Sequence, residues 1–103
     1  MTDLTSAEWQ KQIAQDSQAV IVDVRTQDEV DEGYIPDSVH QDIYNPPAFM
    51  EFVNGLDKSK NYYVYCRSGG RSAQACAIME SVGIETTYNL LGGITKWTGA
   101  VNQ

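Results

Sequence analysis

The feature that most constrains the fold is a continuous, mostly β-branched run from Ala19 to Val24. Such a run is typical of a strand that is covered on both faces, so we expect it to be a central strand. A second run of this kind, Tyr62 to Cys66, predicts another strand. Strands buried on both faces occur in parallel sheets that carry helices on each side.

Helix signals separate the predicted strands. Thr5 with Glu8, and Thr26 with Glu29, have the spacing of a capping box, in which two side chains satisfy free amides at a helix start. Further segments follow from turn residues and apolar periodicity. We expect helices at about 6–15, after 26, 46–54 and 71–82, a brief helix through 97, and weaker strands before 6, at 39–43 and at 86–90. This alternation predicts an α/β fold with a mainly parallel central sheet of about five strands and helices on both faces.

The length of 103 residues, without a repeat or a linker, predicts a single domain over residues 1–103. The net charge of −7 argues against nucleic acid and anionic membranes as partners. No apolar stretch is long enough to span a membrane, and the first ten residues lack the pattern of a secretory signal. With only two cysteines, a reducing, cytoplasmic location is expected.

The segment from Cys66 to Ser72, here called the Cys66 loop, carries the clearest chemistry because it joins a predicted buried strand to a predicted helix. Ligands bind at this edge of open α/β sheets. Gly69 and Gly70 allow the backbone amides to turn inward, and the helix dipole adds positive potential, so the loop predicts an anion site. A cysteine at such a site favours its thiolate, which makes Cys66 the candidate nucleophile.

Three motifs together resemble the single-domain rhodaneses, a family of sulfurtransferases. Asp23-Val-Arg25, followed by Glu29 and then Gly33-Tyr-Ile-Pro36, is similar to the first motif of that family. The Cys66 loop resembles its active loop, and the stretch 92–97 resembles its closing motif. Two positions depart from the pattern: Tyr34 stands where the family often has His, and Asp37 where Gly is common.

The resemblance implies a rhodanese-like domain that moves a sulfane sulfur from a donor such as thiosulfate to cyanide or a thiol, through a persulfide on Cys66. Neither a metal nor an organic cofactor is implied, and the implied acceptors are a small molecule or another protein. The implied substrate-binding residues are Arg67, Ser68, Gly69, Gly70, Arg71 and Ser72. Asp23 and Arg25 are expected to form a structural pair behind the loop.

Several alternatives remain open from the residues themselves. A non-catalytic rhodanese-like module, used for binding, sulfur relay or redox sensing, would also need an accessible thiol of low pKa. A cysteine phosphatase is less favoured, because such enzymes have five residues between Cys and Arg whereas four separate Cys66 from Arg71. Arg71 could contact an anion or pair with a carboxylate, and Cys76 is predicted to pack in the core. The lone His40 predicts no metal site, and the acidic run 28–32 predicts a solvated helix face.

Overall fold

The computed structural model describes residues 1–103 and contains one five-stranded sheet in which all paired strands are parallel. The elements are β1 (Thr2–Leu4), α1 (Ser6–Ala14), β2 (Ala19–Asp23), α2 (Gln27–Asp31), β3 (Val39–His40), α3 (Pro46–Asn54), β4 (Asn61–Tyr65), α4 (Gly70–Ser81), β5 (Thr86–Leu90) and the 3-10 helix η1 (Gly93–Lys96). The strand order is β1-β5-β4-β2-β3. The predicted α/β fold with a parallel sheet is confirmed.

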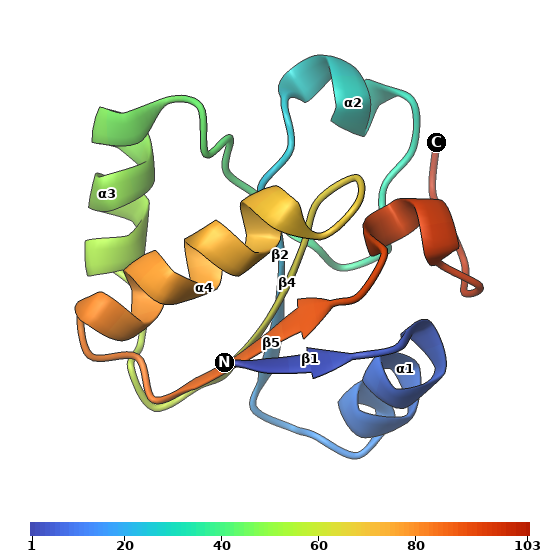
Figure 1. The fold of residues 1–103 in the computed structure, drawn as a ribbon, viewed down its shortest axis with the longest axis horizontal. Coiled ribbons are helices and arrows are strands. Elements are labelled where there is room, and N and C mark those ends of the chain that lie inside the picture. The colour runs from blue at the N-terminus through green and yellow to red at the C-terminus, as the bar shows by residue number, and fades with distance from the viewer.

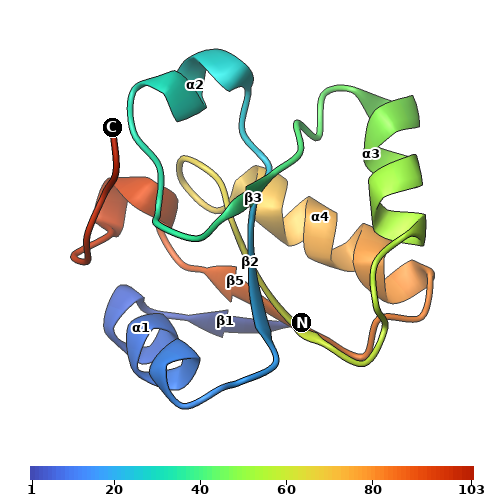
Figure 2. The same cartoon turned by 180° about the vertical axis from the view of Figure 1, so that it is seen from behind.

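The two faces of the sheet carry different helices, α3 and α4 on one side and α1 on the other (Figures 1 and 2). A cluster that includes Val64 and Met79 fills the space under α3 and α4, and a smaller one around Trp9 packs beneath α1. Alternate residues of β4 point into opposite clusters, as a strand requires. Tyr63 and Tyr65 therefore face α1, whereas Cys66, just beyond the strand, belongs to the cluster on the α4 side. No helix has the length and apolar character needed to cross a membrane.

Capping explains where the first two helices begin. Both predicted capping boxes form, with Thr5 at the start of α1 and Thr26 at the start of α2. The Thr26 hydroxyl accepts a hydrogen bond from the Glu29 amide, and the Glu29 carboxylate accepts one from the Thr26 amide. The second box places Glu29 near the carboxyl end of β2, where its other contacts lie.

The run from Ala19 forms β2, an interior strand between β4 and β3 whose side chains pack into both clusters, as expected, although the middle strand of the sheet is β4. The strand expected at 39–43 is shorter than predicted. The edge strand β3 covers only Val39–His40, because the ring of His40 hydrogen-bonds the Arg25 carbonyl that would continue the ladder. The amide of Ile43 donates instead to the carbonyl of Val24, which takes the chain out of register.

The connection between α2 and β3 contains a left-handed residue that is not glycine. Asp37 has a φ of 67°, a region where glycine is favoured and aspartate is among the better-tolerated alternatives. The local backbone therefore explains why a glycine would suit this position. Tyr34, the other departure noted above, pairs through its backbone with Asn102.

Candidate active site

Cys66 lies directly after the middle strand of the sheet, at the carboxyl edge, and α4 begins four residues later. Gly69 has a φ of 109° and immediately precedes α4, so the chain turns back toward the sulfur before the helix starts. A side chain at this position would be strained, which gives a physical reason for glycine here. The loop thus wraps around the sulfur instead of leading away from it.

The sulfur of Cys66 receives hydrogen bonds from the loop. The Gly69 amide donates to Sγ at 3.1 Å, and the Ser72 hydroxyl oxygen lies 3.4 Å from Sγ. Burial raises the pKa of the Cys66 thiol, but the Ser72 hydroxyl and the amides of Ser72, Gly69 and Ser68 together bring that pKa below its ordinary value. Cys66 is only 1% exposed. The site therefore stabilises negative charge on a sulfur that is largely sealed from solvent.

The outer side of the loop is held by η1. The amide of Ile94 donates to the carbonyl of Cys66 at 3.0 Å. Thr95 donates to the carbonyl of Arg67 through its amide at 3.2 Å and through its hydroxyl at 2.8 Å. These bonds fix the carbonyl groups on the outside, which leaves the later amides of the loop to point inward.

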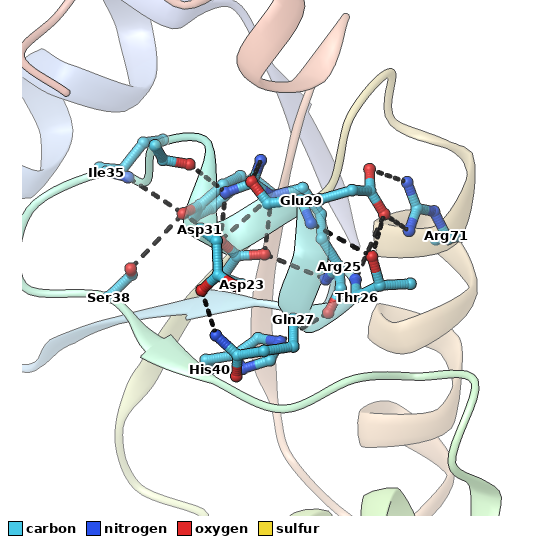
Figure 3. Close-up of polar contacts among 12 residues, drawn as sticks. Asp23, Arg25, Thr26, Gln27, Glu29, Asp31, Ile35, Ser38, His40 and Arg71 are labelled. Carbon is cyan, nitrogen blue, oxygen red and sulfur yellow. Dashed lines mark hydrogen bonds and ion pairs between the residues drawn. The ribbon is translucent and has the colours of Figure 1, made fainter. Parts of the chain in front are cut away.

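The two arginines of the loop have different surroundings. Arg67 is exposed and makes no ion pair. Arg71 donates to both carboxylate oxygens of Glu29, at 2.7 and 2.8 Å (Figure 3). Its guanidinium also lies over the ring of Tyr44. Of the two roles considered for Arg71, pairing with a carboxylate is the one the structure shows. Glu29 is half-buried, so the expectation that the whole run 28–32 is a solvated face was wrong for this residue.

The Glu29–Arg71 pair makes the free energy of unfolding depend on pH in the acid range. Hydrogen bonds from Arg71 lower the pKa of Glu29 from 4.5 to about 2, with a contribution from the Thr26 amide. The stabilisation is complete above the unfolded pKa of 4.5 and is lost as the pH falls toward 2. For this partly exposed pair we expect a loss of about 1–2 kcal/mol in the free energy of unfolding.

This loss is measurable by urea unfolding between neutral pH and about pH 3. The Glu29→Gln variant should start less stable at neutral pH and lose less on acidification than the native chain. The control is Asp28→Asn, an exposed residue of the same helix without an ion pair. A native-like acid dependence in Glu29→Gln would contradict the assignment.

A buried ion pair lies behind the loop. The guanidinium of Arg25 donates to both oxygens of Asp23 and to the carbonyl of Gly33 (Figure 3). The hydroxyl of Tyr65 donates to Asp23 at 2.5 Å and accepts from the amide of Ile35. Because Tyr65 immediately precedes Cys66, this network connects the end of β4 to the α2–β3 connection. Asp23 and Arg25 make no hydrogen bond with the sulfur and are placed to support the strand end.

The remaining chemistry-bearing residues do not join the site. Cys76 is buried in the core on the α4 side, and burial raises the pKa of its thiol to about 12, which disfavours its thiolate. His40 donates through Nε2 to the carbonyl of Arg25. No group of three or more His, Cys, Asp or Glu residues is arranged to hold a metal ion.

Sequence reasoning gave no role in the site to three contributors. The Ser72 hydroxyl donates to Asn89 of β5, and two residues of the motif 92–97, Thr95 and Gly93, contact the backbone of the loop. A polar residue within a buried strand is the only signal that could have drawn attention to Asn89. Fold and site together define a class: a parallel α/β domain with a cysteine of lowered pKa in an amide-lined loop at the carboxyl edge of its sheet.

Comparison with known proteins identifies the family. The Rhodanese-like domain family matches residues 6–100, and the chain belongs to this family. YtwF of Bacillus subtilis, a protein named as a sulfurtransferase, is 37% identical over 97 residues, which cover 94% of this chain and 90% of that protein. The thiosulfate sulfurtransferase GlpE of Pseudomonas syringae is 33% identical over 88 residues, covering 85% and 80%. The crystal structure of a rhodanese-like domain protein from Staphylococcus aureus superposes with a TM-score of 0.85 at 30% identity, covering 99% and 97%.

Proposed function

We propose that this protein is a sulfurtransferase that carries a sulfane sulfur as a persulfide on Cys66. The observation that carries the proposal is the hydrogen bonding of Cys66 Sγ by the Gly69 amide and its contact with the Ser72 hydroxyl, at a thiol whose pKa is lowered. Amide donors around a sulfur favour the negatively charged states through which such a carrier must pass. Membership of a family with sulfurtransferase relatives supports the same role.

The reaction has two displacements. In the first, the Cys66 thiolate attacks the outer sulfur of a donor such as thiosulfate. A bond forms between the Cys66 sulfur and that outer sulfur, while the sulfur–sulfur bond of the donor breaks and sulfite leaves with the electron pair. In the second, a thiolate or cyanide attacks the outer sulfur of the persulfide, and Cys66 leaves as a thiolate. No electrons are gained or lost overall.

The Cys66 loop would serve both displacements in the same way. The backbone from Arg67 to Ser72 would act as the substrate-binding cradle, with its amides around the charged sulfur. Arg71 would act mainly by holding α2 against the loop through Glu29, because both ends of its guanidinium are occupied. The exposed side chain of Arg67 would be available to the donor or to a protein acceptor.

A second candidate is a non-catalytic module for sulfur relay or redox sensing. It is favoured by the burial of Cys66, since a cysteine that is 1% exposed restricts the approach of a small donor. A low-pKa thiol of this kind is also suited to reversible oxidation. The two candidates differ in turnover: the enzyme regenerates its thiolate with each transfer, whereas the module does not cycle with thiosulfate and cyanide.

The test uses the native chain, thiosulfate and cyanide. Incubation with thiosulfate should increase the intact mass by one sulfur atom, and cyanide should restore the original mass while releasing one thiocyanate for each persulfide. Repeated turnover with both compounds would support the enzyme. A persulfide that forms but does not turn over would favour the module, and the absence of any mass gain would overturn sulfur transfer from thiosulfate.

A further inference from the structure

The hydroxyl of Ser72 lies among three acceptors but has one hydrogen to give. Its oxygen is 3.4 Å from Cys66 Sγ, 2.5 Å from Asn89 Oδ1 and 3.2 Å from the carbonyl of Gly69. All of this lies in the interior, because Ser72 is fully buried and Asn89 is 4% exposed. Which acceptor holds the hydrogen therefore decides whether the hydroxyl presents a donor or a lone pair to the sulfur.

The orientation of the Asn89 side chain is set by Asp3. These residues face each other in the register of β5 and β1, and Nδ2 of Asn89 donates to Asp3 Oδ1 at 2.9 Å. A carboxylate accepts hydrogen bonds and does not donate them, so the nitrogen of the amide must point toward Asp3. The oxygen is thereby turned toward Ser72, where it can only accept.

We propose that Asn89 is a positioning residue that holds the hydroxyl hydrogen of Ser72 while Cys66 is a thiol and yields it when the sulfur becomes negatively charged. This assignment rests on the proposed function and describes the hydrogen bonding of that same site before and after Cys66 becomes charged. In the thiol state the hydrogens run in one direction, from Cys66 to Ser72 and from Ser72 to Asn89. In the thiolate or persulfide state the Ser72 hydrogen turns to the sulfur.

Turning the Ser72 hydrogen toward the sulfur raises the free energy of the state in which Cys66 is negatively charged. When Ser72 donates to sulfur, the oxygen of Asn89 loses its donor and remains buried, which is unfavourable. Asn89 therefore opposes the Ser72 hydroxyl and the loop amides, which favour the thiolate. Removing the competing acceptor should make ionisation of Cys66 easier, provided that Ser72 is present.

The charged groups around the loop do not account for the expected effect of Asn89 on the ionisation of Cys66. Glu29, and more weakly the Cys66 thiolate, raise the pKa of Arg71, but Glu29 neutralises that guanidinium. Other charged side chains near the loop are Asp23 at the end of β2 with its partner Arg25 just after the strand, the exposed Arg67 with Glu32 in the same pocket, and Asp3 on β1. Only Asp3 is connected to Ser72 through hydrogen bonds, by way of Asn89.

The test measures how the rate of Cys66 alkylation by iodoacetamide depends on pH, in a Cys76→Ala background that leaves one thiol. Asn89→Leu should move the midpoint of the profile to lower pH and raise the rate below the native midpoint about threefold to tenfold, as expected for one hydrogen bond. In a Ser72→Ala background the same change should have no effect. An unchanged or raised midpoint in Asn89→Leu, or an equal shift without Ser72, would overturn the proposal.

Two variants of the exposed residue Asp3 provide the test if Asn89→Leu does not fold. Asp3→Ala frees the amide to turn its nitrogen toward Ser72, so the midpoint should again move to lower pH. Asp3→Asn removes the charge but keeps an oxygen acceptor for Nδ2, and should stay near the native midpoint. Equal shifts in both variants would show that charge alone acts, and would overturn the proposal. Alkylation needs no sulfur donor, so a failure here is separate from a failure of sulfur transfer.

Discussion

The Cys66→Ala variant should gain no sulfur from thiosulfate and should release no thiocyanate. Both displacements form or break a bond at this sulfur, so its removal eliminates the reaction instead of slowing it. The expected loss of turnover is complete, to the limit of the assay. Intact mass spectrometry after incubation with thiosulfate measures the first displacement, and thiocyanate release measures the second.

Cys76 provides the matched control. It is also a buried cysteine, but its pKa is raised to about 12 and it packs in the core. The Cys76→Ala variant should therefore gain one sulfur and turn over like the native chain, with some loss of stability from the missing core contact. Circular dichroism should show that both variants are folded. Persulfide formation in folded Cys66→Ala would refute the assignment of the carrier.

The Gly93→Ala variant should lose about 3 kcal/mol or more of folding free energy, and its Cys66 should lose its lowered pKa. Gly93 has a φ of 59°, where a side chain is strained. A Cβ atom there would lie 2.5 Å from the carbonyl oxygen of Cys66 and closer still to the carbonyl of Arg67. Because these are backbone atoms, the Cys66 loop itself must move to make room.

Urea unfolding and the alkylation profile measure the two effects separately. Gly70→Ala is the control within the loop, since a Cβ atom at Gly70 meets nothing within 4 Å and its φ is not positive. We expect that variant to keep native stability, or to gain slightly from the better helix propensity of alanine, and to keep the native alkylation profile. If Gly93→Ala were as stable and reactive as Gly70→Ala, the close contact between η1 and the loop would be disproved.

Much of the fold could be predicted from local sequence patterns. The run from Ala19, the capping boxes at Thr5 and Thr26, and the two prolines at the start of α3 placed their elements within a residue or so. Strand order and the length of β3 could not be predicted in this way. They depend on contacts between distant segments, such as the bond from the His40 ring to the Arg25 carbonyl.

The site shows the same division. Cys66 and its loop were recognisable because a nucleophile, two glycines and a helix start are adjacent in sequence. The partners of that loop are not adjacent: Glu29 reaches Arg71 across 42 positions, and Asn89 reaches Ser72 across 17. The capping-box spacing of Glu29 and the polar character of Asn89 within a strand do not indicate contacts with the loop, so only the packing of α2 and β5 around the loop reveals them.

Two of the three arginines gathered at this edge of the sheet are neutralised, Arg25 by Asp23 and Arg71 by Glu29, and the third, Arg67, is exposed to solvent. The hydrogen-bonding groups at close range to the sulfur are a peptide amide and a hydroxyl. Dissolved ions weaken attractions that act through solvent over about 10 Å, but not contacts inside a dry interior. The thiol should therefore keep its acidity as ionic strength rises, and should select sulfur compounds by fit instead of by long-range attraction.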